Sequence, residues 1–287
     1  MEVLIQQLFN GLTIGSVYSL IALGLTLVYG ILHIPNFAHG AVYMIGGYVT
    51  LTMMIYLGFN YWIAIAVSVI AVGALSVLME RFVFHPLRNT ISINSMIAAI
   101  GMLLFLEAFA HLIWGADFRQ MPTPYSQVVT LFGITFTVQR ILIIVSAIAV
   151  MALLYIFLKK TFIGRSIVAM SQNREGAFLV GINANKVAML TFLVAGALAA
   201  IAASLTSPIN LVFPDMGHLV ILKAFVIIII GGMGSIPGAI LGGYILGFSE
   251  SIGATYISGD YKDIIAFVLL VIILSIKPNG IFAKGGN

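Results

Sequence analysis

Residues 137–186 read TVQRILIIVSAIAVMALLYIFLKKTFIGRSIVAMSQNREGAFLVGINANK, and they decide the fold class. The first part, 137–158, is an apolar run that as a helix is long enough to cross a hydrocarbon core about 30 Å thick. From Phe162 to Lys186 the chain then becomes basic and polar, over its longest polar stretch. A membrane protein that works alone has little need of such a segment, whereas one driven from the cytoplasm by a soluble partner requires it. The stretch therefore predicts a helical membrane protein with a docking element beside the bilayer.

The rest of the 287-residue chain has the same apolar character. Hydrophobic residues make up 61% and charged residues 8%, whereas about a quarter of the residues of soluble proteins are charged. Continuous apolar runs exclude a β-barrel, which needs short alternating strands. We predict an all-α, polytopic membrane bundle of about 8–9 transmembrane helices, folded as a single transmembrane domain over residues 1–287. The predicted segments are 6–27, 40–57, 61–82, 94–114, 137–158, 187–206, 219–230, 238–256 and 262–277.

Two of the predicted helices are interrupted. Residues 29–40 read YGILHIPNFAHG, and residues 231–238 read GGMGSIPG, where Pro237 lacks an amide donor and 219–230 before it is short for a full span. Non-helical backbone at membrane depth survives only where it is buried in protein or lines a wet cavity, and transporters place binding and gating elements there. Tight cytoplasmic turns are the alternative interpretation of both interruptions.

Lysine and arginine residues set the predicted orientation, because short cytoplasmic loops are enriched in them. Nine of the 13 cations fall in loops on one side of the predicted segments. They are Arg81, Arg88, Lys159, Lys160, Arg165, Arg174, Lys186, Lys277 and Lys284. This places the N-terminus outside and the C-terminus in the cytoplasm. The net charge of +4 thus reflects membrane topology, and no nucleic-acid partner is expected.

The polar stretch contains a short amphipathic segment, within a cytoplasmic coupling segment over about 160–186. Residues 174–182 read REGAFLVGI, which is typical of a short helix stopped by a glycine. The expected docking residues are Arg174, Glu175, Ala177, Phe178, Leu179, Gly181 and Ile182. Two interpretations remain open, since the apolar face can lie on the membrane surface or dock in a groove of a soluble partner.

Ionisable groups inside the predicted segments are functional candidates, because a charge in lipid costs about 2.5–3.5 kcal/mol on insertion scales. They are Glu107, Lys223 and Glu250. A Lys223–Glu250 pair between neighbouring helices would be mainly structural. By contrast, Glu80 followed by Arg81 is expected to mark only a helix end. Glycines four residues apart at 11 and 15, 238 and 242, and 243 and 247 predict close helix packing within the chain, with a subunit interface as the alternative.

Several chemistries have no matching motif in the sequence. The chain has no cysteine, no phosphate-binding G-x-x-x-x-G-K-[ST] motif and no H-E-x-x-H metalloprotease motif. The glycine-rich run 231–238 lies between membrane-type segments and lacks the βαβ context of a dinucleotide site. No catalytic residue, metal ligand or cofactor site is therefore predicted in this chain.

Two strings, NFAHG at 36–40 and GGMGSIPG at 231–238, are together specific to one family. With further matches over nearly the full length, the chain resembles the permease subunits of bacterial branched-chain amino acid ATP-binding-cassette importers, in particular the smaller of the two permeases. The resemblance implies a heterodimer with a second permease in the inner membrane. It also implies two cytoplasmic subunits that bind Mg-ATP, a periplasmic protein that delivers leucine, isoleucine or valine, and a coupling helix at Arg174–Ile182.

An apolar cargo with a zwitterionic head group calls for a mostly apolar path with a few polar groups. Asn36 is the first choice to line it, because it lies in a broken helix. The full set of expected path residues is Pro35, Asn36, His39, Asn94, Glu107, Asn210 and Glu250. Related permeases carry urea, short amides or other amino acids, so these cargoes are alternatives. An autonomous ion-coupled carrier and a membrane-embedded enzyme are alternatives from other classes.

Overall fold

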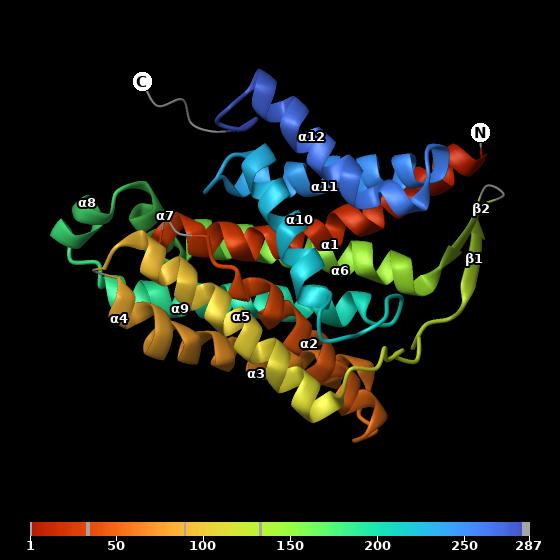
Figure 1. Ribbon diagram of the computed structural model, residues 1–287, viewed down its shortest axis with the longest axis horizontal. Coiled ribbons are helices and arrows are strands. Elements are labelled where there is room, and N and C mark those ends of the chain that lie inside the picture. Colours follow the sequence, from red (N-terminus) through yellow and green to blue (C-terminus); the bar gives the residue numbers. More distant parts are fainter. Residues whose placement is uncertain (1, 33–34, 89, 132–133, 283–287) are drawn as a thin grey trace.

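The computed structural model describes residues 2–32, 35–88, 90–131 and 134–282 (Figure 1). His33 and Ile34 of the first interruption, and Lys284, lie outside these residues. The helices that precede the hairpin are α1 (Glu2–Leu32), α2 (Ala38–Ile55), α3 (Tyr61–Met79), a π-helical turn (Glu80–Phe84), α4 (His85–Leu87) and α5 (Ser92–Trp114). The hairpin comprises β1 (Val128–Leu131) and β2 (Ile134–Thr137). It is followed by α6 (Val138–Lys160), α7 (Phe162–Gln172), α8 (Arg174–Leu179), α9 (Ala184–Thr206), α10 (Met216–Gly231), α11 (Ile236–Tyr256), a 3-10 turn (Gly259–Tyr261) and α12 (Lys262–Ile276).

Every predicted membrane segment is helical, which confirms the all-α fold class. Among the described residues, six helices are long and apolar enough to span a membrane, or seven if the bent pair α10–α11 counts as one span. The axes of α10 and α11 differ by 119°, and the apolar part of α12, Ile264–Ile276, is shorter than a full span. The predicted number of 8–9 spans counted α10, α11 and α12 as three separate crossings. The bent pair α10–α11 can instead count as one span, and the apolar part of α12 is short for a crossing of its own.

The two ends of the molecule differ in structure. In Figure 1, α4, α7 and α8 lie at one end of the long axis, which we call the α8 end. The N-terminal start of α1 and the β1–β2 hairpin lie at the opposite end, the hairpin end. The hairpin is antiparallel, with Val128 opposite Thr137, and it forms in a connection that the sequence analysis treated only as a loop.

Helix α1 lies at the centre of the bundle and crosses α11 closely. A Cβ atom added to Gly15 would lie 2.7 Å from the Tyr244 ring, and one added to Gly247 would lie 2.5 Å from the Gly15 amide nitrogen. Side chains of any size would push the two helices apart. The Ser19 hydroxyl, on the same face of α1, donates to the Ile240 carbonyl at 2.9 Å. The glycine pairs therefore serve packing within the chain, as predicted.

Glycine and proline account for the sharp bend between α10 and α11. Gly232 and Gly234 have φ angles of 97° and 81°, which only glycine adopts readily. The Ser235 hydroxyl then caps α11 by accepting from the Gly238 amide at 3.2 Å, and Pro237 lies in the first turn, where no amide donor is needed. After α12 the chain returns to this bend, where the Ile281 amide donates to the Ile230 carbonyl at 2.8 Å.

Candidate functional site

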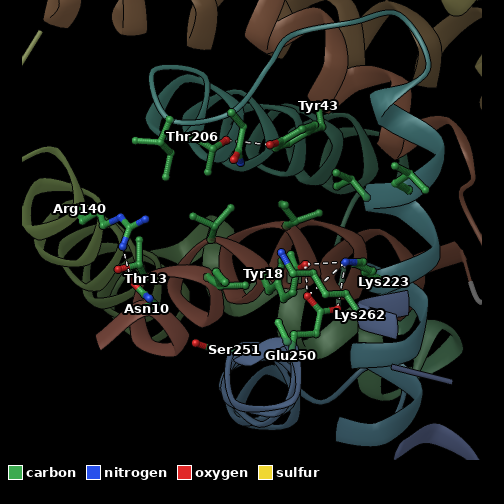
Figure 2. Close-up of a pocket in the computed structure, with 18 of the residues that line it drawn as sticks. Asn10, Thr13, Tyr18, Tyr43, Arg140, Thr206, Lys223, Glu250, Ser251 and Lys262 are labelled. Atoms are coloured by element: carbon green, nitrogen blue, oxygen red, sulfur yellow. Dashed lines mark hydrogen bonds and ion pairs between the residues drawn. The ribbon is translucent and has the colours of Figure 1, made fainter. Parts of the chain in front are cut away.

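A cavity of about 430 Å³ lies between the helices of the bundle (Figure 2). It is lined by α1 as far as Ile21, by the first turns of α6, α10 and α12, by Tyr43 of α2, by the end of α11, and by the end of α9 with the segment that follows it. Its volume falls in the range of small-molecule sites, about 300–1,000 Å³. The lining residues are Gln7, Asn10, Thr13, Ile14, Val17, Tyr18, Ile21, Tyr43, Arg140, Thr206, Ile209, Asn210, Leu219, Val220, Lys223, Glu250, Ser251, Ala254 and Lys262.

Three side chains from α1, α10 and α11 form a charged cluster in the cavity wall, which we call the head cluster: Tyr18, Lys223 and Glu250 (Figure 2). The Lys223 Nζ atom lies 3.0 Å from Glu250 Oε1 and 3.2 Å from Oε2. The Tyr18 hydroxyl donates to Glu250 Oε2 at 2.7 Å and accepts from Lys223 Nζ at 3.0 Å. Side-chain exposure is 3% for Glu250 and 17% for Lys223. The expected Lys223–Glu250 pair therefore forms, and it faces a cavity.

Two further polar pairs border the same space. The Tyr43 and Thr206 hydroxyls are 2.8 Å apart on the side opposite the head cluster, and Arg140 donates to Asn10 where α6 meets α1 (Figure 2). Aliphatic side chains of α1, of α10 and of the segment after α9 share the wall with these groups and with further polar residues such as Gln7 and Ser251. The site is thus a chamber with both apolar and charged walls, which suits a small amphiphilic ligand.

The predicted path residues do not all come together in this cavity. Asn210 and Glu250 line it. Asn36 and His39 are buried between helices, where the His39 imidazole contacts the Ile21 carbonyl at 3.2 Å and the Asn36 Oδ1 atom has no hydrogen-bond partner among the described residues. Pro35, next to Asn36, is half-buried.

The two remaining path residues lie elsewhere. Glu107 is buried in α5 and contacts the His218 imidazole at 2.7 Å, near the hairpin end. Asn94 is exposed in the first turn of α5. Neither of them lines the cavity.

Sequence reasoning did not connect Tyr18, Arg140 and Lys262 with the path. Tyr18 is one hydroxyl in a long apolar helix, and nothing in its local sequence indicates the acid that it contacts 232 residues later. Arg140 and Lys262 do carry a signal, because each is a cation at the start of an apolar segment. The orientation argument considered cations in the loops, and Arg140, which lies inside the predicted segment 137–158, was not considered.

The structure forms a short helix within the coupling segment, as predicted. The Asn173 side chain accepts from the Gly176 amide at 2.8 Å and begins α8. Gly181, at a φ angle of 82°, ends it in a Schellman motif, since its amide donates to Phe178 and the Ile182 amide donates to Ala177.

The apolar residues of this helix point in different directions. Ala177 is buried and Ile182 is half-buried against the core, whereas Phe178 and Leu179 are 72% and 85% exposed at the α8 end. The exposed apolar surface of this segment is therefore formed by the last turn of α8, and not by Ala177 or Ile182.

The prediction that Glu80 only marks a helix end is wrong. The helix continues through it as a π-helical turn, and its side chain is 0% exposed. Glu80 forms an ion pair with Arg88, which is 8% exposed and also donates to the Asn185 side chain at 2.8 Å. Burial lowers the pKa of the Arg88 guanidinium, and the neighbouring carboxylate acts in the opposite direction. Through Arg88 this pair connects the end of α3 with the start of α9, at the end of the coupling segment.

The comparisons with known proteins cover nearly the whole chain. Residues 7–274 match the family described as branched-chain amino acid transport system / permease component. The high-affinity branched-chain amino acid transport system permease protein BraD of Pseudomonas aeruginosa is 39% identical, with 98% of this chain and 96% of that protein aligned. The corresponding protein LivH of Escherichia coli K12 is 37% identical over the same shares. A probable LivH of the archaeon Methanocaldococcus jannaschii is 31% identical over 91% of this chain and 87% of its own.

Two solved structures share the fold at low sequence identity. PsaBC of Streptococcus pneumoniae, in complex with a Fab, has a TM-score of 0.53 and 14% identity over 94% of this chain and 91% of its own. An inward-facing metal-chelate type ABC transporter has a TM-score of 0.53 and 13% identity over 95% of this chain and 85% of its own. At these identities the likeness concerns the helical architecture alone.

Proposed function

The chain belongs to the family of branched-chain amino acid transport system permease components, and on this premise we propose that it forms part of the translocation path of an ATP-driven importer for leucine, isoleucine and valine. The observation that carries the proposal is the alignment of almost the entire chain with permeases named for this cargo. The cavity supports it, because its wall offers both aliphatic side chains and charged groups, which together match the chemistry of an amino acid with an apolar side chain.

The proposed path runs from the cavity towards the α8 end. Asn210 and Glu250 already line the cavity, so they are the first candidates for contact with the cargo. Asn36 and His39 are buried deeper, beside α1, so they would meet the cargo only after the helices move. Pro35, Asn94 and Glu107 belong to the same proposed path. Pro35 and Asn94 lie towards its cytoplasmic end, and Glu107 lies towards its outer end.

The proposed partners are a second permease, two cytoplasmic ATPase subunits that hold Mg-ATP, and a periplasmic amino-acid-binding protein. The exposed last turn of α8 supports the ATPase contact, because Phe178 and Leu179 otherwise expose apolar area to water at the end of the molecule richest in predicted cytoplasmic loops. In this arrangement the N-terminus is periplasmic, the C-terminus is cytoplasmic, and the bacterial inner membrane surrounds the bundle.

The coupling mechanism that we propose is mechanical. Closure of the ATPases would displace α8, which is joined to the bundle through the buried Ala177 and the half-buried Ile182. The Arg88 bond to Asn185 ties the far side of the coupling segment to α3. Displacement of one segment can then tilt several helices together, which is how transporters alternate between inward-open and outward-open states.

Reconstituted uptake tests the proposal. The complete complex in proteoliposomes, with ATP inside and binding protein outside, should accumulate leucine and should not do so without ATP. Phe178→Glu should reduce uptake at least about tenfold and release the ATPase subunits on purification, because a charge in an apolar docking groove is left desolvated. Phe178→Leu, the matched control, should retain most uptake. Leucine uptake by the Phe178→Glu complex at the rate of the wild type would contradict the proposal. Uptake that is driven by an ion gradient without ATP would also contradict it.

A further inference from the structure

We propose that the head cluster binds the charged head group of the cargo, with Lys223 taking the α-carboxylate and Glu250 taking the α-ammonium group. This inference rests on the proposed function, because it assigns the recognition of an amino acid zwitterion to three side chains of the same path. It also assigns a binding role to the Lys223–Glu250 pair. Its position between two helices, taken by itself, indicates only a structural role.

The position of the cluster is the first argument. Tyr18, Lys223 and Glu250 come from three different helices and meet at the wall of a cavity of about 430 Å³. Removing two charges from water costs several kcal/mol per ion, and a buried pair is therefore weak evidence for a stabilising role. A pair that faces a cavity, in contrast, can exchange partners with a ligand that enters it.

Partner exchange keeps the charges balanced. In the structure, Lys223 and Glu250 neutralise each other at 3.0 Å, and Tyr18 contacts both. When the ammonium group of an amino acid replaces Lys223 at Glu250, its carboxylate is available to Lys223. Two ion pairs replace one, and both Lys223 and Glu250 keep a partner of opposite charge. A ligand that carries only one of the two charges would leave either Lys223 or Glu250 without a partner, which is costly for a buried group.

The residues around the cluster provide a place for an apolar side chain. On α1, Ile14, Val17 and Ile21 lie at three- and four-residue intervals around Tyr18, so the four side chains share one face of the helix. On α10, Leu219 and Val220 lie one turn before Lys223. An amino acid held at the head cluster would therefore have its side chain against aliphatic groups on both helices. This arrangement favours an apolar zwitterion over a charged or strongly polar one.

Site-directed labelling can test the inference, because the chain has no native cysteine. Ile209→Cys places one thiol in the cavity wall, at a position that is 39% exposed, and Phe118→Cys places a control thiol outside the cavity at a position that is 66% exposed. The complete permease–ATPase complex, without the binding protein, is treated with N-ethylmaleimide while the leucine concentration is varied. Leucine should slow labelling at position 209 at least about threefold and leave labelling at position 118 unchanged.

Ligands that lack one charge test head-group recognition directly. Leucinamide lacks the carboxylate and 4-methylpentanoate lacks the ammonium group. Each should need at least about tenfold more ligand for half-maximal protection, since losing a hydrogen bond between charged groups weakens binding by about ten- to a hundredfold. Equal protection by leucine and both analogues would overturn the inference.

Substitutions identify the residues responsible. Glu250→Gln should raise the leucine concentration for half protection about tenfold or more, whereas Asp215→Asn, which removes an equal charge outside the cavity, should not change it. Tyr18→Phe removes one hydroxyl and should raise the leucine concentration for half protection about two- to tenfold. If Glu250→Gln fails to fold, the result with Tyr18→Phe tests whether the head cluster binds leucine. Unchanged protection in the folded variants would show that the cluster is only structural.

The same preparation separates this inference from the proposed function. If the wild-type complex takes up leucine but leucine gives no protection at position 209, the head-group assignment is wrong and the transport function stands. If the complex takes up no leucine with ATP and binding protein present, the proposed transport function itself is wrong.

Discussion

Loss of the Arg88 guanidinium should destabilise the protein strongly, because it leaves the Glu80 carboxylate buried without its ion-pair partner. Glu80 is 0% exposed, and water cannot replace the missing guanidinium. Breaking a buried ion pair on one side costs about 3–5 kcal/mol. For domains of about 150–250 residues, each kcal/mol lowers the melting temperature by roughly 2–4 °C, so Arg88→Met should melt about 6–20 °C below the wild type.

Thermal unfolding of the detergent-purified subunit measures this loss, with the fraction of monodisperse protein after heating as readout. The double variant Glu80→Met/Arg88→Met is the matched control, because replacing both charges with apolar groups of similar size is often neutral or stabilising. It should recover most of the lost melting temperature. The reasoning is refuted if Arg88→Met melts within about 2 °C of the wild type, or if the double variant is no more stable than the single one.

Two further substitutions test the roles of particular glycines. Gly247→Val should lower the free energy of unfolding by at least about 1–3 kcal/mol, because its Cβ would lie 2.5 Å from the Gly15 amide nitrogen, and a melting curve near that of the wild type would contradict this close crossing. Gly181→Val should lower the free energy of unfolding by only about 1–2 kcal/mol, because a β-branched residue is strained at a φ angle of 82°. The same substitution should reduce leucine-coupled ATP hydrolysis, because it distorts the end of α8. Equal ATP hydrolysis in wild type and Gly181→Val complexes would show that this end does not transmit force.

The helices were predictable from the sequence because hydropathy and helix-breaking residues are local properties. The run 137–158 is almost entirely apolar after Arg140, and α6 covers it almost residue for residue as Val138–Lys160. The end of α8 at Gly181 follows in the same way, since a glycine after a short amphipathic run favours a left-handed residue there. Such features depend on a few neighbouring residues only.

The cavity was not predictable because its residues are brought together by the tertiary fold. Tyr18 and Glu250 are 232 residues apart, and no local pattern in α1 marks position 18 as different from other polar residues of that helix. The 119° bend likewise depends on how the Gly231 and Gly238 backbones pack against each other, although the breaking residues themselves were visible in the sequence.

The buried ion pair shows a different reason for failure. A charged residue after a long apolar run usually leaves the membrane, so Glu80 was interpreted as a helix end. Its partner Arg88 lies eight residues later, just over two helical turns, and could have suggested a pair along the same helix. The π-helical turn between them changes that spacing, and only the structure shows that both side chains point inwards.

The crossing of α1 with α11 has a consequence for biogenesis. Ser19 and the Ile240 carbonyl that it contacts are separated by 221 residues of sequence. At about 5–20 residues per second, the ribosome needs roughly 10–45 s to make the second helix after the first has emerged. During that interval α1 can pack against α6 and α9, which are made earlier, but its small-residue face lacks its final partner. The first helix of this protein therefore completes its packing only when one of the last helices has been made.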